Sequence, residues 1–181
     1  MKTLVAGPQG SGKSTQAVLL AQDLNVPYIQ LGEIFRNVAL VEDSKQAQEV
    51  RDALESGKLV PADLTAKIIN KRLAQTDCKN GFVLDGFPRN LADIKNFSAG
   101  LDIVVFLKVS DKAGVERLMA RGRTDDTPEL IRQRLKNYYA ETQPILENFK
   151  RLGILVEVDG ERPIDEIHED IVEHLKAREI H

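Results

Sequence analysis

The chain has 181 residues, of which 42% are hydrophobic and 29% are charged, so it has the size and balance of a single globular domain with one sizeable core. Its net charge of -3 argues against charge-driven binding of nucleic acid, and its single cysteine, Cys78, excludes an internal disulfide and a thiolate zinc cluster. No apolar stretch reaches the length of a membrane span, so we expect a cytoplasmic protein that binds neither membranes nor nucleic acid.

Short apolar runs alternate with helix-length segments along the chain. The runs predict five buried parallel strands, at residues 3–6, 28–31, 82–84, 103–109 and 154–158. Helix signals lie between them: Ser44 and Gly57 bound one helix, Ser110 and Thr127 each begin another, and Pro144 is expected to kink or divide the last of these. This order predicts a three-layered α/β fold with a doubly wound, five-stranded parallel sheet.

The first predicted strand leads into a glycine-rich stretch, GPQGSGKST, at residues 7–15. It fits the pattern G-x-x-x-x-G-K-[ST] of a phosphate-binding loop, with Gly7, Gly12, Lys13 and Ser14 at the required places. In such a loop the backbone N–H groups and the following helix hold phosphates, the lysine reaches the outer phosphates, and the serine ligates magnesium. The sequence therefore predicts a fold of the phosphate-loop NTPase type.

Two later places interrupt the simple alternation of strands and helices. Residues 32–72 hold roughly three helical segments between one strand and the next, which is more than a crossover requires. Residues 121–127 form a polar, charged turn between two helices. Both places are candidates for mobile flaps.

Several arginines follow predicted strands or lie near the polar turn. Arg36 comes after the second strand and Arg89 after the third, while a later group comprises Arg117, Arg121, Arg123, Arg132 and Arg134. Each arginine alone has a simple alternative reading as a surface charge. Together they converge with the phosphate loop at one edge of the sheet, which suits phosphoryl transfer because the moving group carries charge on three oxygens.

Asp85 ends the third predicted strand, directly before Gly86. A carboxylate there can order the water shell of a magnesium ion, and the alternative is a turn or helix-capping aspartate. Asp125 and Asp126 have two expected roles, capping the helix at Pro128 and pairing with arginines to hold the polar turn closed.

Taken together and in this order, five motifs resemble the adenylate kinase family: residues 7–15, 32–36, 57–61, 85–89 and 121–126. The resemblance covers essentially the whole chain. It implies one nucleoside monophosphate kinase domain over residues 1–181, with a monophosphate-binding insert at 31–72 and a short lid at 121–127 that lacks the zinc-binding cysteines of longer lids. It also implies a monomeric enzyme without zinc that transfers the terminal phosphoryl group of magnesium ATP reversibly to AMP, giving two ADP.

The resemblance also implies roles for individual residues. The donor site for ATP comprises Gly10, Ser11, Gly12, Lys13, Ser14, Thr15, Arg117 and Arg121. The acceptor site for AMP comprises Leu31, Arg36, Val60, Gly86, Arg89, Asp93, Arg123 and Arg134. The catalytic side chains are those of Lys13, Arg89, Arg121, Arg123 and Arg134. Magnesium is held by Ser14 and Asp85, largely through water, and the lid is latched by Asp125 and Asp126.

Three positions depart from the family pattern. Ser14 replaces a glycine, which is a change toward the general phosphate-loop form, whereas Leu31 replaces a serine or threonine and cannot form a hydrogen bond to a base. Asp93 replaces a glutamine that reads adenine, and an ionised aspartate can only accept hydrogen bonds. Asp93 either reads the base or lies a helical turn away from it. As a reader it could accept a hydrogen bond from the amine of adenine or cytosine, and the two adjacent donors of guanine suit a carboxylate better. AMP remains the expected acceptor, with CMP, UMP or GMP as the alternative.

Other functions remain open at this point. A nucleotide-binding module that has lost catalysis would need only some of the lysine and arginine residues that this chain retains. A small-metabolite kinase such as shikimate kinase would need a different acceptor pocket, and the motif at residues 85–89 weighs against it.

Overall fold

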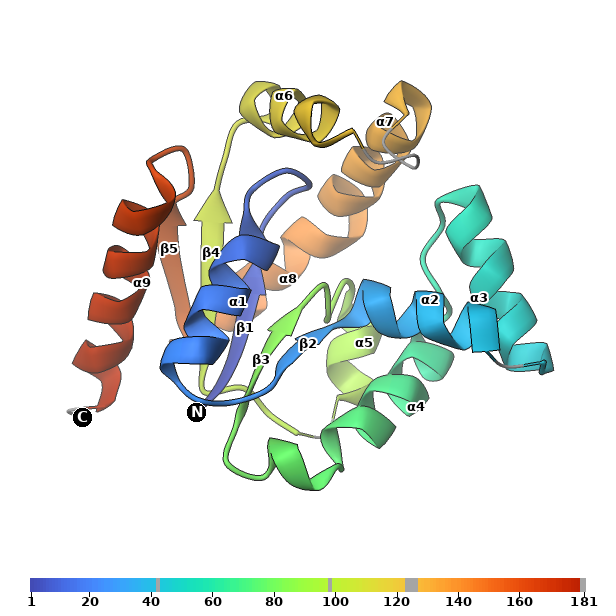
Figure 1. Cartoon of the computed structure of the whole chain (residues 1–181), viewed down its shortest axis with the longest axis horizontal. Helices are drawn as coiled ribbons and strands as arrows, with labels where there is room; N and C mark the ends of the chain where they lie inside the picture. Colours follow the sequence, from blue (N-terminus) through green and yellow to red (C-terminus); the bar gives the residue numbers. More distant parts are fainter. Residues whose placement is uncertain (42, 98, 123–126, 180–181) are drawn as a thin grey trace.

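The computed structural model describes residues 1–41, 43–97, 99–122 and 127–179, and its centre is one parallel sheet (Figure 1). The sheet has five strands in the order β2-β3-β1-β4-β5, and all neighbouring strands run parallel. The strands are β1 (Lys2–Ala6), β2 (Tyr28–Gln30), β3 (Phe82–Asp85), β4 (Ile103–Lys108) and β5 (Leu155–Asp159). The predicted α/β fold with a five-stranded parallel sheet is therefore confirmed.

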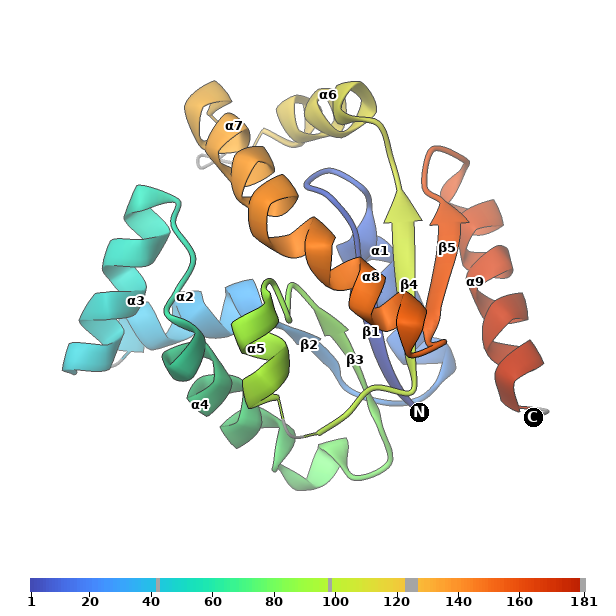
Figure 2. The ribbon, with the colours of Figure 1, turned by 180° about the vertical axis from the view of Figure 1, so that it is seen from behind.

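Helices cover both faces of the sheet, α1 and α9 one face and α8 the other, as the two opposite views show (Figures 1 and 2). The α-helices in the described residues are α1 (Lys13–Asp23), α2 (Leu31–Val41), α3 (Lys45–Ser56), α4 (Ala62–Leu73), α5 (Leu91–Asn96), α6 (Asp111–Arg121), α7 (Pro128–Asn137), α8 (Gln143–Arg151) and α9 (Ile164–Glu179). A short 3₁₀ turn, η1 (Thr76–Cys78), precedes β3, and a π-helical turn, η2 (Tyr138–Thr142), joins α7 to α8.

The core divides between the two faces because successive residues of a strand point to opposite sides. Val5, Val83 and Val105 belong to the hydrophobic cluster that includes residues of α1 and α9. Their neighbours Leu4 and Leu84 belong to the cluster that includes residues of α8 and of the segment α2–α4. The result is the predicted arrangement of three layers.

Helix ends follow the predicted signals. Ser44 begins α3, where its Oγ accepts a hydrogen bond of 3.1 Å from the backbone N–H of Ala47. Ser110 and Thr127 cap α6 and α7 in the same way, and Gly57 ends α3 in the left-handed conformation. These local rules thus place the helices that surround the site.

All five strands differ from the prediction by one residue at one or both ends: β1 begins one residue earlier, β2 and β4 end one residue earlier, β3 ends one residue later, and β5 lies one residue further along the chain. Leu31 does not end a strand, because β2 pairs with β3 only from Tyr28 to Gln30, and Leu31 instead begins α2 as a buried core residue. The last long helix is divided directly before Pro144, as predicted: the π-helical turn η2 separates α7 from α8, and Pro144 lies in the first turn of α8. Proline has no N–H to donate to the preceding turn, so the wider turn lies directly before it.

The segment from α2 to α4 supplies the three helices expected after the second strand, and it lies beside the β2 edge of the sheet (Figure 1). Asn137, at the end of α7, donates from Nδ2 to the backbone oxygen of Gly57 at 3.1 Å and so links α7 to the end of α3.

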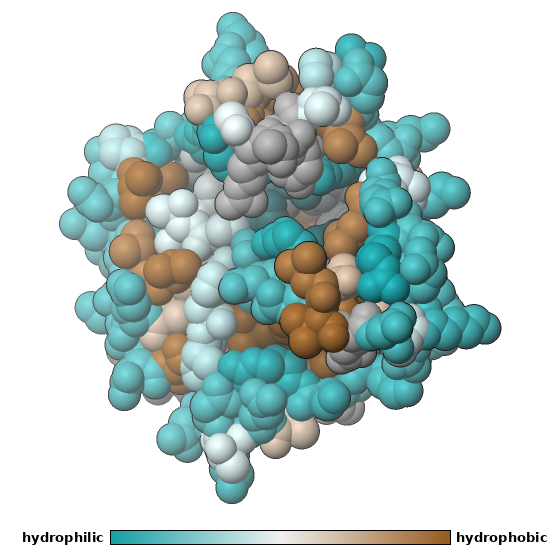
Figure 3. Space-filling view, turned by 45° about the vertical axis from the view of Figure 1, so that its right-hand side comes forward, coloured by the Kyte–Doolittle hydropathy of each residue, from teal (hydrophilic) through white to brown (hydrophobic). Residues whose placement is uncertain are grey.

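The exposed apolar residues Leu40 and Val41 end α2. Figure 3 shows a mostly hydrophilic face on which hydrophobic residues form small separate groups. Within the described residues, no helix is both long and apolar enough to cross a membrane.

Candidate active site

The glycine-rich loop connects β1 to α1 and leaves the start of α1 open. Gly12 is the N-cap of α1 with φ of +86°, a conformation that other residues rarely adopt, and no side chain caps this end of the helix. Ser11 is 1% exposed, and its Oγ has no hydrogen-bond partner within the part of the chain that the structure describes. Uncapped N–H groups and a buried unpaired hydroxyl at a helix N-terminus form a binding site for an anion such as phosphate.

Lys13 lies among other cations at this end of the sheet. Its Nζ donates to the backbone oxygen of Pro8 at 3.2 Å. Burial lowers the pKa of Lys13, and the nearby charges of Arg89 and Arg121 lower this pKa further, while Asp85 opposes them. Several cations held close together create a positive potential that attracts a polyanionic ligand.

Arg89 is fixed by the turn that follows β3. Its Nε donates to the backbone oxygen of Gly86 at 2.7 Å, and its backbone N–H donates to Asp93 Oδ2 at 2.8 Å. Burial lowers the pKa of Arg89, Arg134 adds to this effect, and Asp85 and Asp93 oppose it. The structure thus brings Lys13, Arg89, Arg121 and Arg134 into one electrostatic cluster, although they come from α1, the β3–α5 turn, α6 and α7.

Asp85 ends β3, and only one of its two carboxylate oxygens has a hydrogen-bond donor among the described residues. Its Oδ2 accepts a hydrogen bond of 2.5 Å from Ser14 Oγ, whereas Oδ1 is buried without a partner among the described residues. A carboxylate oxygen with no protein donor, beside a serine hydroxyl, fits a magnesium ion with its water shell. No group of three or more His, Cys, Asp or Glu in the described ranges is arranged to hold a metal, so such an ion would depend on phosphate and water for its other ligands.

Two further residues at Asp85 were missed by the sequence reasoning. Tyr28 OH donates to Asp85 Oδ2 at 3.1 Å, and Gln30 Nε2 lies 3.3 Å from the same oxygen and 3.3 Å from Ser14 Oγ. Polar residues two positions apart on a strand share one face, so this spacing at the end of β2 was the available signal.

Asp93 lies in the first turn of α5 and is 2% exposed. Its Oδ2 accepts the Arg89 N–H, but its Oδ1 is buried without a partner in the described part of the chain. Burial raises the pKa of Asp93 above its usual value, and Glu141 raises it further, while the hydrogen bonds from the backbone of Arg89 and Asn90 lower it. The buried carboxyl is therefore bonded to the backbone of Arg89 through one oxygen, while its other oxygen has no partner among the described residues.

The apolar residues expected at the acceptor base are parts of the core. Leu31 is 1% exposed and Val60 is 6% exposed, and both belong to the same hydrophobic cluster as Phe87. Leu31 also lies near Gly86, since a Cβ atom built on Gly86 would be 4.0 Å from the Leu31 Cβ. These residues can therefore line a base pocket only through atoms that remain accessible to a ligand.

The remaining predicted residues are exposed or fall outside the described residues. Arg36 is exposed on α2, and Arg117 is exposed on α6 and donates to the backbone oxygen of Gly160 at 2.9 Å. Thr15 is exposed in the first turn of α1. Arg123, Asp125 and Asp126 fall outside the residues that the structure describes.

Gly10 brings the phosphate loop against α6. A Cβ atom on Gly10 would clash with the backbone of Gly114, and a Cβ on Gly114 would lie 2.7 Å from the backbone oxygen of Gln9. Both positions therefore need glycine for this close approach. Through it, the loop touches the helix that ends at Arg121.

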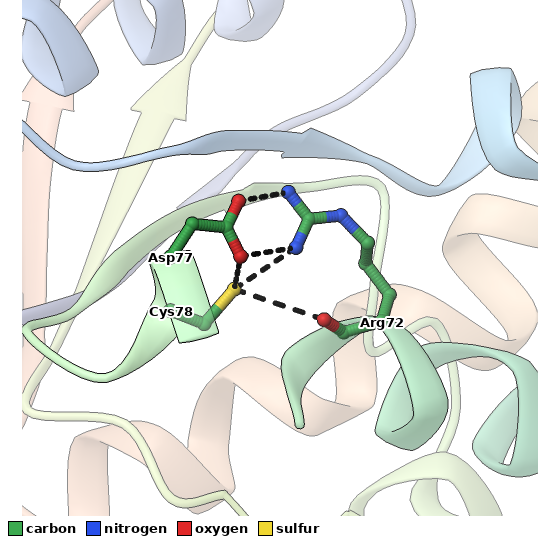
Figure 4. Close-up of polar contacts among 3 residues, drawn as sticks. All are labelled: Arg72, Asp77 and Cys78. Atoms are coloured by element: carbon green, nitrogen blue, oxygen red, sulfur yellow. Dashed lines mark hydrogen bonds and ion pairs between the residues drawn. The ribbon is translucent and has the colours of Figure 1, made fainter. Parts of the chain in front are cut away.

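Cys78 belongs to a separate polar cluster with Arg72 and Asp77 (Figure 4). Arg72 forms an ion pair with Asp77 at 2.8 Å and donates from Nη1 to Cys78 Sγ at 3.1 Å. Burial raises the pKa of the Cys78 thiol, so the thiol stays protonated near neutral pH and is a poor nucleophile. This cluster ties α4 to η1 and agrees with an unreactive, reduced cysteine.

Comparisons with known proteins agree with the architecture of this site. The family model described as adenylate kinase matches residues 5–154. The chain is 43% identical to the adenylate kinase of Bifidobacterium longum, over 97% of this chain and all of the relative. It is 39% identical to the adenylate kinase of Nocardia farcinica, over 93% of this chain and 96% of the relative, and 40% identical to that of Mycobacterium tuberculosis, over 92% and 94%. With a family model that matches residues 5–154 and this likeness over nearly its whole length, the chain belongs to the adenylate kinase family.

Proposed function

We propose that this chain catalyses the reversible transfer of the terminal phosphoryl group of magnesium ATP to AMP, with two molecules of ADP as the product. The observation that carries this proposal is the cluster of Lys13, Arg89, Arg121 and Arg134 around the open end of the phosphate loop. A transferring phosphoryl group needs positioning and stabilisation of its negative charge, and this cluster supplies both without a side-chain nucleophile.

Each residue of the donor side has a role in this proposal. Lys13 and the N–H groups of residues 10–15 hold the ATP phosphates, and Arg117 lies against the donor base. Arg121, Arg123 and Arg134 surround the group in transit. Ser14 and Asp85 hold magnesium largely through water, and the ion supplies charge neutralisation for the phosphates when it is bound.

The acceptor side uses a second set of residues. Arg36 and Arg89 clamp the phosphate of AMP, while Leu31, Val60, Gly86 and Asp93 border the base. Residues 31–72 form the insert that carries most of this side, and residues 121–127 form the lid, with Asp125 and Asp126 as its latch. Closure of the lid excludes water, which would otherwise hydrolyse ATP.

A second acceptor class has one specific observation in its favour. The buried carboxyl of Asp93 has an unpaired Oδ1 among the described residues, which as a carboxylate would accept hydrogen bonds from the amino groups of guanine or cytosine. The names of the relatives favour AMP.

Initial rates with magnesium ATP against AMP, CMP, UMP, dAMP and GMP in parallel test the proposal. We expect a clear preference for AMP. A preference for CMP, UMP or GMP would keep the chemistry and change the acceptor, whereas no transfer to any of them would overturn catalysis and leave a nucleotide-binding module.

The same assay with Asp93→Gln tests how the base is read. If Asp93 contacts the base, a glutamine amide, which both donates and accepts, should raise the preference for AMP. An unchanged acceptor profile would show that Asp93 only holds the Arg89 turn.

We also propose that the enzyme works in the cytoplasm as a monomer, and sedimentation of the purified chain tests the oligomeric state.

A further inference from the structure

We propose that Tyr28 and Gln30 are positioning residues that hold one oxygen of Asp85 and so keep its other oxygen available for the water shell of the nucleotide-bound metal. This inference rests on the proposed function, because it concerns the metal that accompanies ATP.

The geometry at Asp85 is unequal between its two oxygens. Oδ2 receives Ser14 Oγ at 2.5 Å, Tyr28 OH at 3.1 Å and Gln30 Nε2 at 3.3 Å. Oδ1 receives no donor from the described residues, although Asp85 is only 1% exposed. A buried carboxylate oxygen without a donor is costly, and a metal-bound water would supply the missing hydrogen bond.

The pairing of β2 with β3 brings these groups together. Gln30 lies opposite Asp85 in the parallel register, and Tyr28 lies opposite Val83. Tyr28, Gln30 and Asp85 therefore point to the same face of the sheet, which is the face covered by α1 and its Ser14. Because strand positions are rigid, these two donors fix the orientation of the carboxylate more firmly than loop residues would.

The chemistry of the two donors suits this role. The Tyr28 phenol carries a hydroxyl hydrogen that it donates to Asp85 Oδ2, since a tyrosine side chain is protonated at neutral pH. Gln30 Nε2 reaches both Ser14 Oγ and Asp85 Oδ2. If the Ser14 hydroxyl turned to a bound metal ion, Tyr28 and Gln30 would still hold Asp85.

A purely structural role is the main competing explanation, in which the two residues only fasten β2 to β3. Metal affinity separates the two explanations, because removing a contact that only fastens β2 to β3 would leave the affinity for the metal unchanged. Partners that orient a metal-binding group typically change metal affinity about 10- to 100-fold when they are removed.

The experiment compares Tyr28→Phe, Gln30→Met and the double variant with two matched controls. Tyr139→Phe removes a tyrosine that donates to Asp111, and Gln48→Met removes a glutamine that donates to Asp52 at 2.7 Å on α3. Each protein is mixed with an ATP analogue that has nitrogen between its outer phosphates and is titrated with Mn²⁺. Free Mn²⁺ is followed by electron paramagnetic resonance.

We expect the double variant to bind Mn²⁺ about 10-fold more weakly than the wild type, with smaller losses in each single variant and none in the controls. In the transfer assay, the concentration of Mg²⁺ for half the maximal rate should rise, while the KM for AMP stays unchanged. Wild-type Mn²⁺ affinity in the double variant would overturn the inference.

The outcome is separable from that of the proposed function. A wild-type chain that transfers no phosphoryl group but binds the nucleotide with Mn²⁺ fails the proposed function, and the affinity comparison is still decisive. If thermal unfolding shows that the double variant does not fold, Tyr28→Phe alone carries the test, because it keeps the ring and removes only the donor.

Discussion

Asp93 keeps a carboxyl group at 2% exposure with Oδ1 unpaired among the described residues, and this arrangement couples folding to pH. Because burial raises the pKa of Asp93, the folded chain holds this proton more tightly than the unfolded chain. Between the ordinary aspartate pKa and the raised value, the folded state therefore binds more protons, and the free energy of unfolding falls as pH rises.

Replacing Asp93 by asparagine should remove this dependence. The amide of Asp93→Asn would keep an oxygen to accept the Arg89 N–H, but it would not titrate. We expect the free energy of unfolding of the wild type to fall relative to that of Asp93→Asn as pH rises above the ordinary aspartate pKa of about 4, because the folded wild type must give up a proton that it holds more tightly than the unfolded chain does. Urea unfolding at several pH values measures the difference, and parallel pH profiles for the two proteins would contradict the prediction.

The residues with a strong local signature were the ones that sequence could identify. Lys13 is marked by the loop around it, and Arg89 by the motif that ends β3. Tyr28 and Gln30 carry no such motif, since their role exists only because β2 and β3 pair in one register. The burial of Asp93 was not predictable either, because it depends on how α5 packs beneath the Arg89 turn.

At the scale of elements, the contact between the phosphate loop and α6 depends on Gly114. Replacement of a helical glycine by alanine usually stabilises a helix by up to about 1 kcal/mol. At Gly114 the added Cβ would lie 2.7 Å from the Gln9 oxygen, so the helix or the loop must move.

We therefore expect Gly114→Ala to lower the free energy of unfolding by about 1–3 kcal/mol and to raise the KM for ATP, because the loop that binds its phosphates is displaced. Gly32→Ala is the matched control, since its Cβ would lie at an ordinary distance of 3.5 Å from Arg36 Nη1. The control should keep or gain stability in thermal and urea unfolding. A stabilised Gly114→Ala would show that α6 does not rest on the loop in solution.

Helix limits were predictable where a capping side chain sets them, as Ser44 and Gly57 do for α3. The turn η2 was not, because a π-helical turn depends on the packing of α7 and α8 as well as on the proline that follows. The short β2 was predicted one residue too long for a similar reason. Its length is set by its partner strand, and the apolar Leu31 fits a strand and a buried helix start equally well.

At the scale of the whole molecule, the cluster of cations at one end of the sheet is expected to help phosphoryl transfer while lowering the stability of the unliganded chain. Removing Arg89 should reduce the rate of phosphoryl transfer by about 100-fold or more, because the proposed clamp that positions the phosphate of AMP is lost. The free energy of unfolding of the unliganded chain should change far less, because the cost of burying the guanidinium and its repulsion with Arg134 are relieved, while its attraction to Asp85 and Asp93 and its hydrogen bond to Gly86 are lost.

The contribution of Arg89 to ligand binding can be measured through the stability that a bound ligand adds. A bisubstrate compound that joins two adenosines through a phosphate chain should raise the free energy of unfolding of the wild type by about 4 kcal/mol at a thousand times its Kd. At the same concentration Arg89→Ala should show most of this gain lost, whereas Arg151→Ala, a surface change on α8, should keep it. Thermal unfolding with and without the compound measures both, and normal turnover in Arg89→Ala would remove this residue from the site.

The pairing of β1 with β3 has a consequence for how the reaction distance is set. The two strands are hydrogen-bonded neighbours with Val5 opposite Asp85; the glycine-rich loop follows β1, and Arg89, the proposed acceptor clamp, follows β3. Adjacent strands lie about 4.8 Å apart. In the proposed function, the donor and acceptor phosphates are thus held from backbone anchors on neighbouring strands. The surrounding helices can be lengthened, shortened or exchanged between related chains without altering that spacing, whereas a one-residue slip of β1 against β3 would turn the anchors to opposite faces.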